Sequence, residues 1–329
     1  MNVVVKQKKI VVVLSSSFKG WILEGQIRDA AHASKVKLKL RFKPHRKLHF
    51  FHVIDQLKYL AIFLNTSQLL IVNQMTFFSL VSNRILRINP SICDVFYTHF
   101  TDYGLSRKQQ AYILSSCRRI FVYNSIDKNS LVKDGVPEDK LTVVYGGIDR
   151  NLFYPQPKTN YQRFNSINNY VLIAGHCKLR KNPFLILEVI QKMPNQNFVI
   201  HGLGWEDFFS KNLFEIPKNL LIKKFQFSNQ PKLVREALVY LSLSTTEGGP
   251  FPTLEALASG TPVVATSTGW NLEVILENNG VVLQNKPTVD EVIQGIILAS
   301  DLKPLIFQRD LLNGNFTWEQ FGKKIFNLA

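Results

Sequence analysis

The sequence predicts an α/β protein made of two doubly wound, Rossmann-like domains, and three observations support this prediction. Short apolar runs, typical of buried strands, alternate with segments of helical length, which indicates parallel sheets covered by helices on both faces. The alternation stops at residues 151–169, where Pro, Asn and Gln are frequent and no periodicity is visible, and then starts again. With 329 residues, 46% of them hydrophobic, the chain is long enough for two cores of ordinary size.

Residues 1–155 are predicted to form the N-terminal domain. Its apolar runs predict strands, and the segments between them predict helices, the third of which we expect Ser125 to cap. A segment at 75–86 is rich in aromatic residues. The predicted strands are 10–14, 36–42, 69–72, 94–98, 120–123 and 141–144, and the predicted helices are 20–34, 105–116 and 125–135.

A linker at 156–169 is followed by a second predicted domain at 170–312 and a C-terminal helix within 313–329. Because ligands of doubly wound folds bind at the carboxyl ends of the strands, we expect functional residues in the loops that follow strands. The predicted strands are 170–175, 198–201, 220–222, 238–244, 262–265 and 281–283, and the predicted helices are 183–193, 232–237, 252–259, 289–300, 303–312 and 318–328.

The stretch at 246–266 contains the residues that most clearly suggest a ligand-binding site. A strand leads into a turn with the adjacent Gly248 and Gly249, and the following helix has Pro252 in its first turn and ends at Gly260. The turn and the helix start leave N–H groups free, and the helix dipole adds positive character, so the place suits a phosphate or a sugar oxygen. Carboxylates flank the turn on both sides, and a carboxylate accepts hydrogen bonds from hydroxyl pairs such as those of a ribose or hexose. The spacing alone is also compatible with a tight structural turn between solvated glutamates.

From residue 247 to residue 264 the sequence resembles the Glu-x7-Glu motif of retaining family-4 glycosyltransferases, written E-G-x-G-x-x-x-x-E-A-x-A-x-G-x-P-V-V. It departs from the motif at Gly249-Pro250, where many members have Phe-Gly, which affects the shape of the sugar pocket. The resemblance implies the GT-B fold, in which two Rossmann-like domains face each other across a cleft. It also implies transfer of a sugar, with retention, from a nucleotide-sugar donor to a glycan or lipid-linked glycan acceptor, as in polysaccharide biosynthesis. No cofactor and no metal are expected, and the absence of any Asp-x-Asp sequence agrees with this expectation.

The resemblance also implies roles for single residues. Glu255 is expected to bind ribose hydroxyls, and Glu247 to bind the sugar or to stabilise positive charge that develops at its reactive carbon. The turn that follows Glu247 is expected to hold the phosphates and the sugar of the donor. Its residues are Gly248, Gly249, Pro250 and Phe251.

The loop at 175–183 joins the first strand of the second domain to its helix. Family members carry Gly-Arg-x-x-x-x-Lys here, so Gly175 and Lys181 match, whereas His176 stands at the position of the Arg. Fixed cations aimed at a departing diphosphate stabilise the negative charge that grows on it, which gives Lys181 and Arg180 a catalytic role. His176 is shorter than Arg and can be neutral, so we expect stabilisation of the leaving group either to be weaker or to be shared with Arg180. A solvated basic loop is the alternative.

Four further residues match positions of the family's functional loops. His99, just past a predicted strand, corresponds to a His that contacts the donor sugar, although a packed histidine at a strand end is the alternative. Gly20 corresponds to the glycine of the first loop, and Gly202 to a loop near the base. Trp270 lies in a stretch that resembles the family's Gly-Gly loop, where it is expected to flank the nucleotide.

The charge of the chain is strongly basic and unevenly distributed. The net charge is +16, and residues 1–50 contain twelve Lys or Arg against only Glu24 and Asp29. The alternating run at 35–41 places its cations on one face of a strand, which suits an anionic membrane surface, whereas nucleic acid is a less favoured partner and a merely basic soluble surface is the alternative. The histidines of the same region at 45, 49 and 52 have no local carboxylate or Cys and do not predict a metal site.

The cysteines and the apolar segments predict a cytoplasmic protein, with the inner face of the membrane as a second location. The three Cys residues are dispersed, without the spacing of a metal or redox motif, and are expected to be reduced. The sequence has no apolar run of eighteen residues and no secretory signal at its start.

Other functions remain open at this point. One is a partner or regulatory subunit that kept the GT-B fold but lost efficient catalysis, which the His at position 176 favours. Another is a polyanion-binding protein that acts through the basic first domain. A sugar-nucleotide epimerase of the same fold is not supported by the motif pattern.

Overall fold

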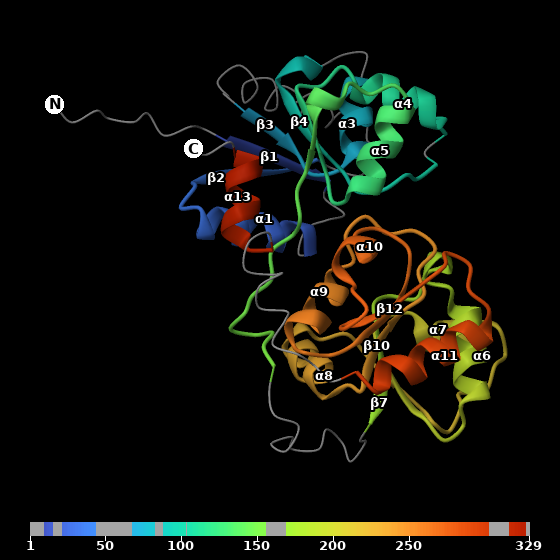
Figure 1. Cartoon of the computed structure of the whole chain (residues 1–329). Coiled ribbons are helices and arrows are strands. Elements are labelled where there is room, and N and C mark those ends of the chain that lie inside the picture. The colour runs from blue at the N-terminus through green and yellow to red at the C-terminus, as the bar shows by residue number, and fades with distance from the viewer. Residues whose placement is uncertain are drawn as a thin grey trace. The chain divides into compact units, whose positions relative to one another are not determined.

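The computed structural model describes residues 10–15, 22–43, 68–82, 88–102, 104–155, 169–302 and 316–326. Contacts divide the chain into two units, Met1–Gly147 with Trp318–Ala329, and Ile148–Thr317. This division falls after Gly147, whereas the sequence predicts a domain boundary after residue 155, and it assigns the last helix to the first unit. Within the described residues, each unit contains one six-stranded sheet whose paired strands are all parallel (Figure 1).

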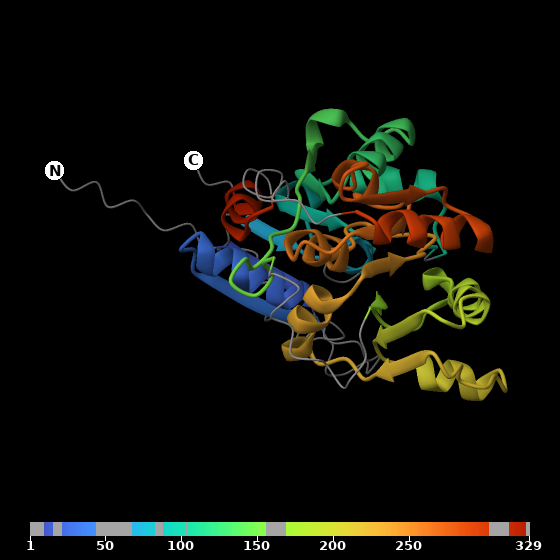
Figure 2. The same ribbon diagram turned by 60° about the horizontal axis from the view of Figure 1, so that its bottom comes forward.

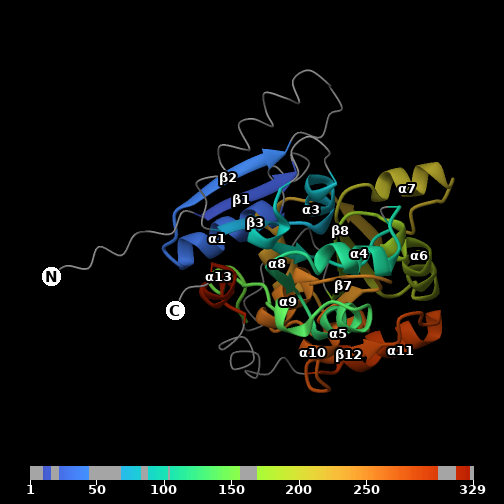
Figure 3. The same cartoon turned by 90° about the horizontal axis from the view of Figure 1, so that it is seen from above.

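The sheet of the first unit has the strand order β2-β1-β3-β4-β5-β6. Its strands are β1 Ile10–Ser15, β2 Leu38–Lys43, β3 Gln68–Ile71, β4 Cys93–Tyr97, β5 Arg119–Val122 and β6 Leu141–Val143. Figure 3 shows β2, β1 and β3 side by side at one end of this sheet. The helices are α1 Ile22–Ala33, α3 Gln74–Val81, α4 Arg107–Leu114, α5 Ser125–Lys133 and α13 Trp318–Phe326, with 3-10 turns η2 Pro90–Ile92 and η3 Glu138–Lys140.

Alternate residues of these strands pack on different helices. Val95 and its neighbours on one face form a core with residues of α3, α4 and α5. On the other face the ring of Phe96 stacks on Phe321 of α13, with 5.8 Å between ring centroids. Figures 1 and 2 show α13, in red, beside α1, in blue, although the two helices are almost the whole chain apart in sequence. The last helix therefore completes the core of the first unit.

The sheet of the second unit has the strand order β12-β11-β10-β7-β8-β9. Its strands are β7 Tyr170–Ala174, β8 Asn197–His201, β9 Leu220–Lys223, β10 Val239–Ser242, β11 Val263–Thr266 and β12 Gly280–Leu283. The helices are α6 Pro183–Lys192, α7 Trp205–Lys211, α8 Gln230–Glu236, α9 Phe251–Ala258, α10 Asn271–Val274 and α11 Val289–Ser300, with 3-10 turns η5 Leu179–Lys181 and η6 Phe227–Asn229.

The strand order of this second sheet changes direction at one place. From β7 the chain proceeds outward through β8 and β9, and then returns to β10, which pairs with the opposite edge of β7. From β10 it proceeds outward the other way through β11 and β12. The loops after β7 and β10 therefore leave adjacent strands in opposite directions, which is the place where doubly wound folds bind ligands.

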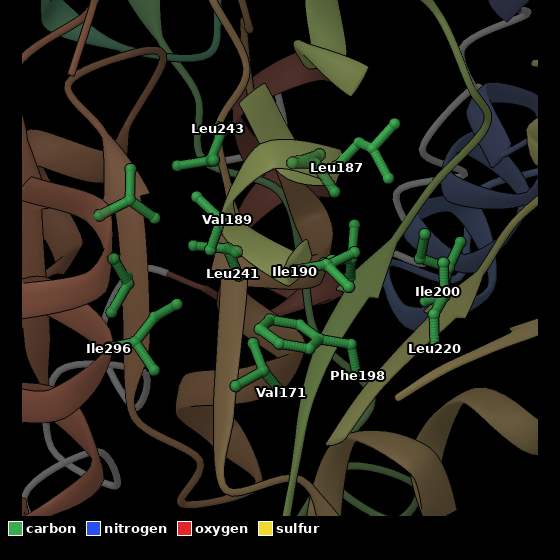
Figure 4. Packing of buried hydrophobic residues seen from close by; sticks show 14 of the residues in the cluster. Val171, Leu187, Val189, Ile190, Phe198, Ile200, Leu220, Leu241, Leu243 and Ile296 are labelled. Atoms are coloured by element: carbon green, nitrogen blue, oxygen red, sulfur yellow. The ribbon is translucent and has the colours of Figure 1, made fainter. Parts of the chain in front are cut away.

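The core of the second unit fills one face of its sheet, under α6, α7 and α11. Val171, Phe198 and Leu241 from neighbouring strands pack with Ile190 of α6 and Ile296 of α11 (Figure 4). The residues between them in each strand point to the other face of the sheet, which α8 and α9 cover. There the hydroxyl of the buried Tyr170 donates a hydrogen bond to the carbonyl oxygen of Leu233, at 2.7 Å.

Most predicted elements are confirmed, with some differences at their ends. Asn124, not Ser125, caps α5, because the Asn124 side chain accepts the hydrogen bond from the backbone N–H of Asp127. Pro252 does lie in the first turn of α9, and Gly260 follows its end with a φ of +75°. The helix α3 lies where the sequence shows only an aromatic-rich segment, and it was not predicted, nor were the short helices α7 and α10. The predicted helix at 303–312 and the linker at 156–168 lie outside the described residues.

The described helices include none with the length and apolar character needed to cross a lipid bilayer. The basic run at 35–41 belongs to the described residues, and the exposure of its side chains is known up to residue 40. Lys37 and Lys39 are exposed at alternate positions around β2, next to the half-buried Leu38 and Leu40, as its alternating pattern predicts. The three histidines at 45, 49 and 52 lie outside the described residues.

We expect Phe198→Ala to lower the free energy of unfolding by about 3–5 kcal/mol, because the ring is buried in the core and its loss leaves a cavity. Urea unfolding followed by circular dichroism measures this change. Leu213→Ala is the matched control: this side chain is 91% exposed, and the substitution should change the unfolding free energy by less than about 0.5 kcal/mol. Equal effects of the two substitutions would contradict the assigned core.

Candidate functional site

The loops that follow β7 and β10 are joined to each other. The backbone N–H of Thr245 donates a hydrogen bond to the carbonyl oxygen of Arg180, at 2.7 Å. In return, the guanidinium group of Arg180 donates to the carbonyl oxygen of Thr246, at 3.0 Å. Segments 65 residues apart in sequence are thereby fixed at the point where the strand order of the second sheet reverses.

Glu247 forms the centre of a compact group of charges. One oxygen of its carboxylate, Oε1, accepts hydrogen bonds from Nη1 of Arg180 at 2.5 Å and from Nζ of Lys181 at 2.6 Å. The Glu247 side chain is only 9% exposed, and burial alone would raise its pKa, but Lys181 and Arg180 together lower the pKa to about 2. At neutral pH the group therefore contains one negative and two positive charges, and its remaining positive charge can attract an anion.

The backbone of the loop at 175–182 brings both cations to Glu247. Lys181 ends the 3-10 turn η5, and the next residue, Asn182, has left-handed angles of φ 58° and ψ 52°. Pro183 then starts α6. Gly175 has a φ of +127°, and a Cβ atom there would lie 3.5 Å from Cε of Lys181. The Lys181 side chain thus passes over Gly175, whose positive φ favours glycine at this position.

The glycine turn lies against a buried tryptophan. A Cβ atom on Gly249 would overlap the ring of Trp270, so only glycine allows this close contact. The ring of Phe251 packs edge-on against Trp270, with 5.1 Å between centroids. Trp270 is fully buried. The prediction that Trp270 flanks a nucleotide is therefore wrong: the ring is used to support the turn, because a large apolar side chain gains most by being removed from water.

Glu255 lies about one turn into α9 in surroundings unlike those of Glu247. Its Oε2 atom accepts a hydrogen bond from the side-chain amide of Gln230, at 2.8 Å. Burial raises the pKa of Glu255 to about 7, although the Gln230 hydrogen bond acts in the lowering direction. This carboxyl group thus changes its protonation near neutral pH, and only its ionised form accepts hydrogen bonds at both oxygens.

His176 is held by the neighbouring loop after β8. The backbone N–H of Leu203 donates a hydrogen bond to its Nδ1 atom, at 3.2 Å. Burial, followed by the charges of Lys178 and Lys181, lowers the pKa of His176, so the imidazole is neutral at neutral pH. A Cβ atom on Gly202 would overlap the backbone of Gly175, so a glycine is needed where the two loops meet.

The predicted site residues His99 and Gly20 belong to the part of the chain assigned to the first unit. His99 belongs to the first unit, directly after β4, and is half-buried. Its carbonyl oxygen accepts a hydrogen bond from the side-chain amide of Gln74, at 2.8 Å. Gly20 lies outside the described residues. In the parts of the chain that the structure describes, three or more His, Cys, Asp or Glu residues nowhere come together as a metal-binding group.

Two residues of the site were not predicted from the sequence. Gln230 contacts Glu255, and His201 contacts Gln230. Their positions offered one weak signal, since His201 ends a predicted strand and Gln230 lies two residues before the predicted helix at 232–237. Neither spacing nor residue type indicated that these residues reach a carboxylate further along the chain.

The sequence and the fold were compared with those of known proteins. Residues 158–310 match the family model described as glycosyl transferases group 1. An uncharacterized glycosyltransferase of Methanocaldococcus jannaschii is 26% identical over 236 residues, which cover 65% of this chain and 60% of that protein. One subunit of the human phosphatidylinositol N-acetylglucosaminyltransferase is 23% identical over 287 residues, which cover 79% of this chain and 55% of the human protein. The Anabaena protein HepE, solved in complex with UDP and glucose, has a TM-score of 0.73 at 15% identity, covering 97% of this chain and 98% of HepE.

Residues 158–310 are thus similar in sequence to glycosyl transferases group 1, and the fold is similar to that of HepE. The predicted fold class, two Rossmann-like domains of the GT-B type, is confirmed by the two parallel six-stranded sheets and by this structural likeness. The chain spans about 60% and 55% of the lengths of the two curated relatives. The family match covers residues 158–310, and it includes both loops that meet at Glu247.

We expect the ion pairs of Glu247 to make stability depend on pH in the acid range. Because the folded-state pKa of about 2 lies below the ordinary value of 4.5, this stabilisation is complete above pH 4.5 and is lost as the pH falls toward 2. Glu247→Gln should be less stable than the wild type by about 3 kcal/mol at neutral pH. The difference should shrink as the pH falls through that window.

Urea unfolding at a series of pH values from 7 to 2.5 measures this difference. Glu215→Gln, at an exposed position of the same unit, is the control and should follow the wild-type curve. A difference between Glu247→Gln and the wild type that stays constant over the whole range would show that Glu247 is not held ionised by the two cations.

Proposed function

We propose that the chain is a glycosyltransferase that transfers a sugar, with retention and without a metal ion, from a nucleotide-sugar donor to a glycan or lipid-linked glycan. The observation that carries this proposal is the group of Glu247, Arg180 and Lys181 beside the glycine turn. It lies where the strand order of the second sheet reverses, and its two cations and one carboxylate match what a sugar diphosphate presents. The HepE complex with UDP and glucose supports the donor class.

Lys181 and Arg180 would act on the leaving group. When the bond between the sugar carbon and the diphosphate oxygen breaks, negative charge grows on the diphosphate. Fixed cations stabilise that charge without having to reorganise, because Glu247 and the backbone already hold them in place. Cations that are already oriented in this way supply the stabilisation that a metal ion gives in other enzymes.

The two carboxylates and the turn would hold the sugar and the ribose. Glu255 would accept hydrogen bonds from the ribose hydroxyls, and the backbone of Gly248, Gly249, Pro250 and Phe251 would contact the phosphates and the sugar. Glu247, ionised at neutral pH, would bind the sugar or stabilise positive charge at its reactive carbon. Retention and membership of the family-4 subtype rest on the resemblance of the motif at 247–264.

The acceptor would be bound with the help of the first unit. His99, which follows β4, would contact the donor sugar, and the resemblance of the sequence assigns Gly20 to the substrate-binding residues as well. The exposed Lys37 and Lys39 suit an anionic membrane surface. The human relative is named for action on phosphatidylinositol, a lipid, which supports a lipid-linked acceptor. The basic residues of β2 agree with a peripheral location on the inner face of the membrane.

A GT-B partner subunit with impaired catalysis is a second candidate, and one observation favours it. His176 stands where the motif has Arg, and it is held neutral by burial and by the nearby lysines. A neutral imidazole stabilises a departing diphosphate less than a guanidinium does. Assays of sugar transfer and of donor hydrolysis separate the two candidates, since an impaired subunit binds the donor without turning it over.

We expect Lys181→Ala and Glu247→Ala to reduce the rate of transfer by at least about 100-fold, because each removes charge that stabilises the transition state. A thermal-shift screen of nucleotide sugars identifies the donor, and a transfer assay with that donor measures the rates. Lys192→Ala, at an exposed lysine of α6, is the matched control and should keep the wild-type rate. Near-normal turnover of folded Lys181→Ala protein would overturn the assignment.

We also expect donor affinity to rise between pH 6 and pH 8. Glu255 ionises near pH 7, and its ionised form is the better acceptor for ribose hydroxyls. Calorimetric titration of the donor nucleotide at several pH values measures the dependence. Glu255→Gln should bind more weakly at pH 8 and should lose most of the pH dependence. A wild-type affinity that does not change over this range would contradict the role of Glu255.

A further inference from the structure

Glu255 is the last member of a line of hydrogen bonds that starts in the backbone after β9. The N–H of Gln226 donates to Nε2 of His201 at 3.0 Å. Nδ1 of His201 is 2.6 Å from Oε1 of Gln230, and Nε2 of Gln230 donates to Oε2 of Glu255 at 2.8 Å. The line joins the end of β8, the start of α8 and the first turns of α9.

The two side chains in the middle of this line are buried. His201 is 0% exposed and Gln230 is 2% exposed. Burying polar groups without hydrogen-bond partners is costly, and here both ring nitrogens of His201 and both side-chain polar atoms of Gln230 have partners. A fully satisfied polar network of this kind restricts its members to one arrangement.

The direction of every bond in the line follows from its first donor. A backbone N–H can only donate, so Nε2 of His201 accepts and carries no proton. Nδ1 of the neutral ring then carries the proton and donates it to Oε1 of Gln230. The amide of Gln230 is thereby fixed with its NH2 group toward Glu255, where a carboxylate oxygen must accept.

The surroundings of His201 favour its neutral form. Burial lowers its pKa, the hydrogen bond to Gln230 acts in the raising direction, and the charge of Lys223 lowers the pKa further. The ring of Phe225 covers the imidazole, with 5.0 Å between ring centroids. A protonated ring would place an N–H against the N–H of Gln226, so the neutral form is the only one that fits the line of bonds.

We propose that His201 and Gln230 are positioning residues that hold the carboxylate of Glu255 in one orientation and present it as a hydrogen-bond acceptor to the donor. This inference rests on the proposed function for the identity of the ligand. The arrangement of the line itself does not depend on that function. Neither residue would touch the donor, and both act through Glu255.

The chain allows a matched pair of substitutions at one position. His201→Asn places an amide N–H near the position of Nδ1 and keeps the donor toward Gln230. His201→Gln places an amide near the position of Nε2. It keeps an acceptor for the backbone N–H of Gln226 but loses the donor to Gln230. Gln230→Met removes the bond to Glu255 while nearly conserving the shape of the side chain. Thermal unfolding of each variant shows that it is folded.

The first readout is the pKa of Glu255 in the free protein, followed by NMR of carbon-13-labelled glutamate carboxyls and assigned with Glu255→Gln. Gln230→Met should raise this pKa by about one unit, because a hydrogen bond to the ionised form is lost. His201→Gln should raise it in the same direction, and His201→Asn should keep it near the wild-type value. A purely structural role would make both His201 variants lower the melting temperature and leave this pKa unchanged.

The second readout is the affinity for UDP, the nucleotide of the HepE complex, at pH 7. Gln230→Met should bind UDP about tenfold more weakly than the wild type, and His201→Asn should bind it more tightly than His201→Gln. An unchanged pKa of Glu255 in folded Gln230→Met protein overturns the inference, whatever the protein binds. A shifted pKa, together with a wild-type protein that binds no nucleotide or nucleotide sugar, leaves the line of bonds standing and overturns the proposed function.

Discussion

The arrangement of the two loops at the site in the second unit depends on one buried carboxylate, which binds two cations. Glu247 lies within the loop after β10, and both Arg180 and Lys181 come from the loop after β7. A buried carboxylate left without cations would be costly, so the ion group fixes both loops in a single arrangement. The same bonds hold the cations at the reversal of strand order, which is where an anionic ligand of this fold binds.

The two glutamates of the motif have opposite environments although they lie only eight positions apart. Glu247 meets two cations, and its pKa falls to about 2, whereas Glu255 meets a neutral amide, and its pKa rises to about 7. The first is a permanent charge that organises the cations, and the second is a group that responds to pH near neutrality. A pair of carboxyl groups with separated pKa values can take different roles in one site.

Close packing and hydrogen bonds from neighbouring residues hold the segments that carry these charged side chains in fixed positions. Trp270 packs against Gly249 and Phe251, so the ring of a buried tryptophan supports the glycine turn. Gly202 allows the loop after β8 to contact Gly175 closely. In the same region the backbone N–H of Leu203 donates a hydrogen bond to Nδ1 of His176. His201 and Gln230 give Glu255 a polar support from two further elements. Glu255 is thus positioned by side chains that would not contact the ligand, and the turn beside Glu247 is supported by a buried ring.

The sequence by itself determined the alternation of strands and helices, because the period of apolar residues is a local property, and it also determined the glycine turn with its two glutamates. It did not reveal that α13 packs in the first unit, that Trp270 is buried, or that His201 and Gln230 reach Glu255. These are contacts between segments far apart in the chain, and no local pattern of residue types records them. Strand order decides which loops become neighbours, so only the tertiary structure could bring Arg180 and Lys181 to Glu247 and set its protonation.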